Sequence, residues 1–131
     1  MNQYATAKQA YTEAAVLTAP PEQLVVMLYD GAIRFLTQAA AALRAGQHEQ
    51  FAIRLRRAEA IINELNSTLD MQRGGDVAAR LRSIYLFSKR HLLEARLRLD
   101  PTRIDQVVKL LSELRESWAE LASQNRAADA A

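Results

Sequence analysis

Six apolar residues in the middle of the chain repeat in alternating steps of four and three, and this spacing constrains the fold more than any other feature. They are Phe51, Leu55, Ala58, Ile62, Leu65 and Leu69. The spacing places all six side chains on one face of an α-helix, because a helix turns once every ~3.6 residues. Glycines interrupt the pattern on both sides, at Gly46 and at Gly74-Gly75. Residues 47–70 are therefore predicted to form one amphipathic helix that needs helical partners for its apolar face.

Three further segments of similar length show helical apolar spacing and are bounded by residues that break helices. Their predicted bounds are 20–45, 76–99 and 101–122. Asp100-Pro101 separates the last two, because proline disfavours helical geometry in the residue before it and suits a first helical turn. Four helices joined by short breaks predict an all-α fold, an antiparallel up-down-up-down four-helix bundle over residues 19–122.

Two single residues carry local predictions within these helices. Asp76 follows the paired glycines, and its side chain is predicted to cap the helix that begins there. Gly31 lies in the interior of the first helix, where a glycine costs about 1 kcal/mol relative to alanine. We interpret Gly31 as a point where two helices approach closely, since close packing would offset that cost.

The two ends of the chain are predicted to lie outside the bundle. Residues 1–18 are polar and alanine-rich with few large apolar groups, which predicts a mobile or short-helical N-terminal arm. Ordering about fifteen such residues costs more than burial of one tyrosine and one leucine returns. We therefore expect the arm to be a marginally docked, displaceable flap. Residues 123–131 are small and polar and are predicted to be a frayed tail.

The composition argues against most kinds of catalytic and metal centre. The chain has 131 residues, the length of one ordinary domain, with no cysteine and two histidines. This excludes disulfide scaffolds, thiolate zinc sites, iron–sulfur clusters and cysteine nucleophiles. The sequence also lacks a Glu-x-x-His pair of the kind that holds di-iron in bundles, and a phosphate-binding glycine loop. We expect a protein that is not an enzyme and has no cofactor or metal.

Charge and hydropathy argue against nucleic acids and membranes as partners. Seventeen Lys+Arg against fifteen Asp+Glu leave a net charge of +2, which does not favour nucleic-acid binding. The helix over 76–99 is rich in arginine and the helix over 101–122 in glutamate, so these neighbours are expected to neutralise one another. No apolar run approaches the ~20 residues of a membrane span, and no secretory signal is visible. We expect no nucleic-acid partner, no membrane insertion and a cytoplasmic location.

Two of the predicted helices carry more apolar residues than a bundle needs. A core-facing helix needs about three apolar positions per heptad. Residues 24–36 nevertheless contain only two charged side chains, Asp30 and Arg34, and the stretches 84–87 and 92–93 repeat the effect. One helix turned wholly inward would explain the first stretch alone. We interpret the excess on two helices as an outward apolar groove that takes a partner's amphipathic helix.

The alternative is that the same residues form core and dimer contacts in a homodimerising structural or regulatory module. In either case the candidate partner-binding residues are the apolar side chains of the arm and of these two helices. They are Tyr4, Tyr11, Leu17, Val26, Met27, Tyr29, Ile33, Tyr85, Leu86, Phe87 and Leu93.

An ordered series of short motifs runs from the first helix to the last. The motifs are Thr18-Ala-Pro-Pro-Glu-Gln-Leu24, Met27-Leu28-Tyr29-Asp30-Gly31-Ala32, Ala58-Glu-Ala-Ile61-Ile62-Asn-Glu64-Leu65, Leu69-Asp70, Gly74-Gly75, Leu81 with Tyr85, Leu92-x-x-Ala95 and Leu114-Arg-x-x-Trp118. In this order and spacing they resemble the FliS family, the flagellin-specific export chaperones, from Tyr11 to about Leu121. The ordered set carries the resemblance, because each motif alone is short. The chain departs from the family pattern at Leu86, Phe87 and Arg96.

The resemblance implies a bacterial cytosolic chaperone whose client is the C-terminal segment of newly made flagellin. That segment is disordered in the monomer and becomes coiled coil in the filament. Binding it would prevent premature polymerisation and keep flagellin competent for type III export, without a nucleotide. The resemblance implies the flagellar export apparatus as a further partner, and we also expect a weak homodimer. The family's short N-terminal segment, matched here around Tyr11, is thought to lie over part of the empty groove.

Overall fold

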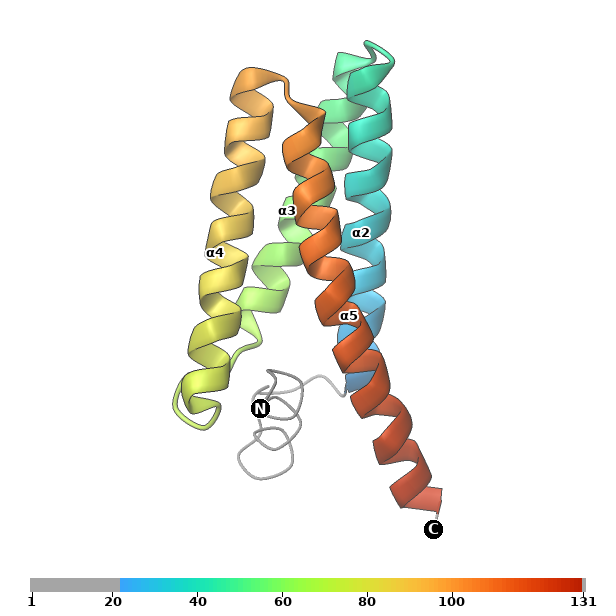
Figure 1. The fold of residues 1–131 in the computed structure, drawn as a ribbon, viewed down its shortest axis with the longest axis vertical. Coiled ribbons are helices and arrows are strands. Elements are labelled where there is room, and N and C mark those ends of the chain that lie inside the picture. The colour runs from blue at the N-terminus through green and yellow to red at the C-terminus, as the bar shows by residue number, and fades with distance from the viewer. Residues whose placement is uncertain (1–21, 131) are drawn as a thin grey trace.

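The structure is a computed structural model that describes residues 22–130, and this part of the chain is formed by four α-helices. They are α2 (Glu22–Arg44), α3 (His48–Ser67), α4 (Gly75–Arg98) and α5 (Pro101–Ala130). Successive helices run in opposite directions (Figure 1). The predicted all-α, antiparallel up-down-up-down bundle is confirmed. The N-terminal arm expected over residues 1–18 lies outside the described residues.

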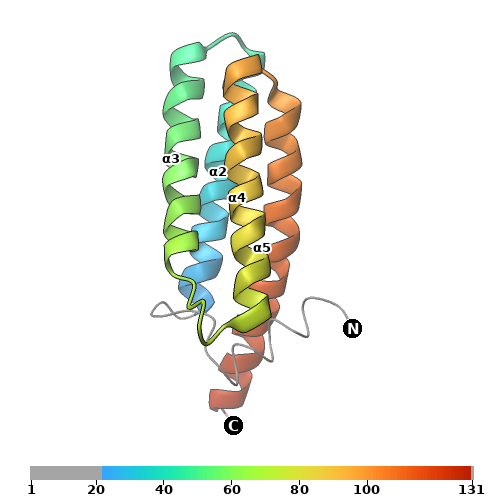
Figure 2. The ribbon, with the colours of Figure 1, turned by 90° about the vertical axis from the view of Figure 1, so that its left-hand side faces the viewer.

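The helices occupy the four corners of the bundle in chain order. α2 packs against α3 on one side and α5 on the other, and α4 packs against the same two helices. Figure 2 shows α4 in front and α2 behind, with α3 and α5 to the sides. α2 and α4 are therefore diagonal neighbours. Their inner faces meet at the centre of the bundle, and their outer faces point to opposite sides.

The apolar seams predicted from the sequence meet in one core. All six residues of the four-three repeat are buried, five of them on α3 and the last, Leu69, just after its end. The other three helices contribute fully buried side chains at helical spacing: Val25, Ala32, Leu36, Ala39, Ala78, Leu92, Ala95, Ile104, Val107 and Leu111. Burial of these side chains stabilises the bundle, and the spacing on each helix sets which face turns inward.

α2 ends at the glycine that the sequence indicated. Gly46 has a φ of +73°, a backbone conformation that a glycine adopts without a steric penalty. Its N–H donates to the Leu43 carbonyl at 3.1 Å, and the Gln47 N–H donates to the Ala42 carbonyl at 2.9 Å. These paired bonds form a Schellman motif, which satisfies two carbonyls that the helix end would leave free.

α4 and α5 differ in how their first turns are capped. α4 begins at Gly75, whose φ is +53°, and Gly74 before it makes no side-chain capping bond. The prediction that Asp76 caps this helix is wrong, because the glycine lets the chain enter the helix one residue earlier. Asp76 lies in the first turn, where a carboxylate still favours the positive end of the helix dipole. Asp100 does act as a cap, since its Oδ1 accepts the Thr102 N–H at 3.0 Å.

α5 continues as a helix to Ala130, so the helix end predicted at residue 122 is wrong. The extension projects past the other helices at one end of the bundle (Figure 1). Two polar contacts support its start: the Gln124 amide donates to Glu120 at 3.2 Å, and the Asn125 amide donates to Glu22 of α2 at 3.0 Å. Alanine, glutamine and arginine are also good helix formers. The prediction of a frayed tail considered the small size and polarity of these residues but not their helix propensity.

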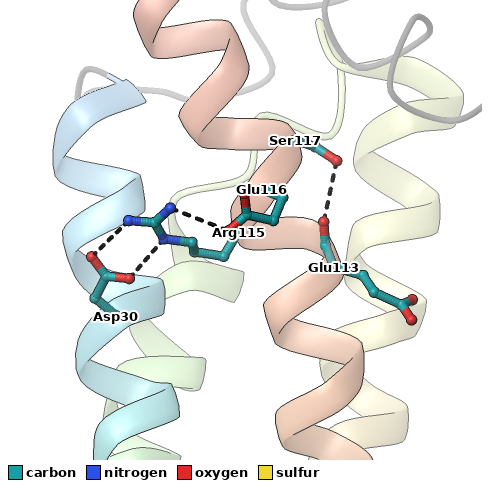
Figure 3. A network of polar contacts seen from close by, with 5 residues as sticks. All are labelled: Asp30, Glu113, Arg115, Glu116 and Ser117. Carbon is teal, nitrogen blue, oxygen red and sulfur yellow. Dashed lines mark hydrogen bonds and ion pairs between the residues drawn. The ribbon is translucent and has the colours of Figure 1, made fainter.

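The ion pairs between different helices join α2 to α5 and α3 to α4, and none joins α4 to α5 among the side chains described. Arg115 of α5 donates from Nε to Asp30 of α2 at 2.8 Å (Figure 3). Arg96 of α4 pairs with Glu59 of α3. The opposite charge bias of α4 and α5 is therefore not expressed as direct ion pairs between the described side chains of these two helices.

Gly31 is buried where α2 meets α3. A Cβ added there would lie 3.2 Å from Cδ1 of Ile61. This contact is tighter than ordinary van der Waals distance, so the interpretation of Gly31 as a point of close approach is confirmed.

Substituting Gly31 is expected to have opposite consequences for small and large side chains. Gly31→Ala should change the free energy of unfolding by less than about 1 kcal/mol, because the gain in helix propensity offsets a small shift of the Ile61 methyl group. Gly31→Leu should cost about 1–3 kcal/mol through overpacking. Urea unfolding measures both, and adding Ile61→Ala to Gly31→Leu should recover part of the loss. A Gly31→Leu protein as stable as the parent would contradict close packing at this position.

Candidate partner-binding surface

Tyr29 and Tyr85 lie in the core and not on a surface. Their side chains are 0% and 1% exposed, and their rings pack with centroids 6.4 Å apart. The two phenol oxygens share a hydrogen bond, and the Trp118 indole N–H donates to the Tyr29 oxygen. The prediction that these tyrosines are exposed for partner binding is wrong. They come from diagonal helices, so their side chains meet in the centre of the bundle.

The burial of these two phenols should make stability fall at high pH. Desolvation raises the pKa of Tyr29 to about 12, although hydrogen bonds from Tyr85 and Trp118 act in the opposite direction. Desolvation likewise raises the pKa of Tyr85, and its neighbour Tyr29 adds to the effect. An unfolded tyrosine titrates near pH 10. The folded state therefore binds more protons between about pH 10 and 12, and stability must fall across this window.

The expected result is a stability plateau up to about pH 10, then a progressive loss towards pH 12. Urea unfolding at a series of pH values measures it, with tyrosinate absorbance as the readout of ionisation. The Tyr29→Phe and Tyr85→Phe double variant is the control, and its stability should depend less on pH in this window. Tyrosinate absorbance that followed four free tyrosines, reaching half of its full value at pH 10 in the folded protein, would contradict burial of the pair.

The apolar excess of α2 is mostly accounted for by its position between two helices. Val26 and Ile33 are half-buried and pack against the core. Leu28 and Phe35 do the same on other sides of the helix. Met27 differs, because its side chain is 66% exposed. One helix turned largely inward therefore explains this stretch, as the sequence allowed.

The apolar excess of α4, in contrast, faces outward. Leu86 and Leu93 are 40% and 47% exposed, and Leu97, which sequence reasoning missed, is 69% exposed. Residues 86, 93 and 97 share one side of the helix, because their spacings are seven and four. The spacing is visible in the sequence, but Leu97 lies between two arginines and outside the apolar stretches 84–87 and 92–93. We call Leu86, Leu93 and Leu97 the α4 leucine stripe.

Phe87 lies beside the stripe rather than on it. It is one residue after Leu86, which turns its side chain about 100° around the helix. Its ring is 44% exposed and stacks on His91 with centroids 5.0 Å apart. His91 in turn contacts Gln106 of α5. Phe87 therefore faces the α5 side of α4.

The candidate residues do not form one groove. Met27 is exposed on α2, and the α4 leucine stripe is exposed on α4, the diagonal neighbour of α2. The prediction of a single outward groove shared by these two helices is wrong, because a diagonal arrangement keeps their outer faces apart. Tyr4, Tyr11 and Leu17 lie outside the described residues, so their part in a binding surface stays a prediction.

The part of the chain that is described offers little for a metal ion or a membrane. Among the side chains that the structure describes, residues 22–125, no three His, Asp or Glu gather in a group that could hold a metal ion. α2 is the one helix found in this range that is long and apolar enough to cross a membrane by length and composition. A core helix of a soluble protein passes the same test, and the inward face of α2 lines the bundle core.

Comparison with known proteins identifies the family to which the chain belongs. The family model described as "Flagellar protein FliS" matches residues 2–125, nearly the whole chain. The chain belongs to the FliS family. The flagellar secretion chaperone FliS of Salmonella typhimurium is 39% identical over 114 residues, which cover 86% of this chain and 84% of that protein. FliS of Campylobacter jejuni is 35% identical over 115 residues, 88% and 90% of the two chains. FliS of Bacillus subtilis is 31% identical over 117 residues, 89% and 86%.

Membership of the FliS family places the chain among flagellar secretion chaperones and indicates a non-enzymatic role. The family resemblance seen in the sequence motifs is thus confirmed. Of the three departures from the family pattern, the structure accounts for Arg96, which pairs with Glu59 and ties α4 to α3. The other two, Leu86 and Phe87, put additional apolar surface on the outside of α4.

Proposed function

We propose that the chain is a cytosolic chaperone that binds the C-terminal segment of flagellin, prevents its premature polymerisation and keeps it competent for flagellar export. The match to the FliS family over residues 2–125 carries the proposal. The relatives that resemble it are named flagellar secretion chaperones. The flagellar export apparatus is proposed as a second partner, which would receive the loaded complex.

The exposed apolar side chains of α4 support a binding role. A flexible segment that folds on binding must bury apolar area to offset the entropy lost on ordering. Leu86, Leu93 and Leu97 offer three large apolar groups in line on one helix. A second apolar contact is available at Met27 on the opposite side of the bundle. A long client segment that wraps around the bundle could reach both, whereas one short helix could not.

Titration of a flagellin C-terminal segment into the full chain tests the proposal. Calorimetry should give a defined stoichiometry, and circular dichroism should show more helix in the mixture than in the two parts. Flagellin truncated at its C-terminus is the control and should not bind. Failure of the intact segment to bind, with the bundle folded, would overturn the proposal. Self-association of the chain through the same residues would favour the homodimerising module.

Two substitutions on α4 should separate client binding from folding. Leu86→Ser with Leu93→Ser removes two exposed side chains, each worth about 1.5 kcal/mol when buried, so affinity should fall roughly 100-fold. Leu99→Asn is the matched control, because Leu99 is 52% exposed but lies beyond the end of α4. Its φ of +50° also suits asparagine. Equal affinity of all three proteins would remove the leucine stripe from the binding surface.

The N-terminal arm is proposed as a lid that a client displaces. Deleting residues 1–17 should leave the melting transition nearly unchanged, because the arm contributes little net free energy to the fold. Binding of an apolar dye should rise. Tighter flagellin binding after the deletion would indicate a pure lid, whereas weaker binding would indicate that Tyr11 also grips the client. Loss of the folded state would show that the arm is part of the core.

A further inference from the structure

Positive charge without an ionic partner lies beside the α4 leucine stripe. Arg82 and Arg90 are exposed and Lys89 is half-buried. None of the three forms an ion pair with another residue of the described chain. Arg96, further along the same helix, is different because it is held by Glu59. The outer face of α4 therefore combines apolar and uncompensated basic groups.

Exposed residues along the outer face of α4 follow the heptad spacing of a coiled coil. Steps of three and four join a line of five exposed residues: Ser83, Leu86, Arg90, Leu93 and Leu97. We call this line the α4 seam. Positions of this spacing form the contact face of one helix against another. The seam is about 21 Å long at 1.5 Å per residue, enough for a helix of some four turns. Arg82 and Lys89, seven residues apart, run along one edge of it.

Arg90 determines which charge a helix that covers the α4 seam must carry. It lies between Leu86 and Leu93, so a helix that buries both leucines also covers its guanidinium group. A charge removed from water is costly unless an opposite charge pairs with it. The covering helix must therefore bring a carboxylate to Arg90, and further carboxylates would meet Arg82 and Lys89 at the edge.

We propose that the α4 seam docks an amphipathic helix of a partner protein that carries acidic residues opposite Arg82, Lys89 and Arg90. This inference deepens the proposed function and rests on it only for the natural source of such a helix, a segment of the flagellin client. The leucines supply apolar contact area, and the basic residues select the register and the charge of the bound helix.

The same charges disfavour two other occupants. A second copy of the chain, paired seam to seam, would bring two basic edges together, and like charges across an interface are repulsive. An anionic membrane would accept the basic groups. However, helices that lie on membranes have a broad apolar face, whereas the seam is a narrow line with an arginine in its centre. Heptad spacing fits a facing helix instead.

Two designed peptides probe the seam independently of flagellin. Both are amphipathic helices with leucine at the contact positions, one with glutamate and the other with lysine at the flanking positions. The glutamate peptide should bind the full chain at least about tenfold more tightly than the lysine peptide in 0.1 M salt. The difference should shrink in 1 M salt, because the screening length falls from about 10 Å to about 3 Å.

A charge reversal with a matched control assigns the effect to the seam. Arg82→Glu with Arg90→Glu should reverse the preference, so that the lysine peptide binds more tightly. Arg56→Glu with Lys109→Glu makes the same change in net charge at two exposed residues on α3 and α5, and it should leave the preference as it was. Circular dichroism of the variants checks that the bundle is intact.

The outcomes distinguish this inference from the proposed function. No binding of either peptide, equal binding of both, or equal effects of the two double reversals would overturn the inference. So would binding to vesicles of anionic phospholipid without binding to the glutamate peptide. If the glutamate peptide binds as expected but flagellin does not bind the parent protein, the inference stands and the proposed client is wrong. If flagellin binds and the Arg82→Glu, Arg90→Glu variant binds it equally well, flagellin is not the source of the acidic helix.

Discussion

Replacing Leu111 by alanine is expected to lower the free energy of unfolding by about 2–5 kcal/mol. The Leu111 side chain is 0% exposed and lies in the middle of α5, among core residues of the other helices. The substitution removes the transfer free energy of the lost methyl groups and leaves a cavity that close-packed neighbours fill only in part. Leu65→Ala on α3 is expected to lose a similar amount, because Leu65 is 1% exposed.

Urea unfolding of the two variants measures these losses, and Leu97→Ala is the matched control. The same chemical change at Leu97, on the outer side of α4 and 69% exposed, should alter stability by no more than about 0.5 kcal/mol. Alanine and leucine have similar helix propensities, so the comparison isolates burial. A Leu111→Ala protein as stable as the Leu97→Ala protein would mean that the inward face of α5 has been misassigned.

The sequence could predict the core because each seam depends only on spacing within its own helix. The four-three repeat that begins at Phe51 fixes the buried side of α3 without any knowledge of its neighbours. The helix ends near Gly46 and Asp100 could be predicted for the same reason, because each depends on the backbone conformation or side-chain hydrogen bond of a single residue. The order of the helices around the bundle follows from the short connections between them.

The binding surface was harder to predict, because it depends on which helices are neighbours. A count of apolar residues gave α2 and α4 the same excess, but α2 lies closely between two helices and uses its excess there. Tyr29 and Tyr85 lie within the apolar stretches of α2 and α4, so an excess of apolar residues does not distinguish them from surface residues. Their meeting across the bundle depends on the diagonal arrangement of α2 and α4, which spacing within one helix does not reveal.

The hydrogen-bonded chain of Trp118, Tyr29 and Tyr85 gives the second prediction. Tyr29 is its central member, because it bonds both to the Trp118 indole N–H and to the Tyr85 phenol. Tyr29→Phe should therefore cost about 2–4 kcal/mol, since it leaves two buried polar groups without their partner. Tyr85→Phe should cost about 1 kcal/mol, because Tyr29 keeps its bond from the indole. Both substitutions retain the ring and so change packing little.

A double-mutant cycle by urea unfolding decides whether the three groups act together. With both tyrosines replaced by phenylalanine, only the Trp118 indole N–H loses its hydrogen-bond acceptor. Tyr29→Phe alone leaves the Tyr85 hydroxyl without its partner as well. The loss in the double variant should thus be smaller than the sum of the single losses, by at least about 0.5 kcal/mol. Additive losses, or a larger loss for Tyr85→Phe than for Tyr29→Phe, would contradict Tyr29 as the centre. Because Trp118, Tyr29 and Tyr85 come from α5, α2 and α4, their interactions at the middle of the bundle join α4 to both α2 and α5.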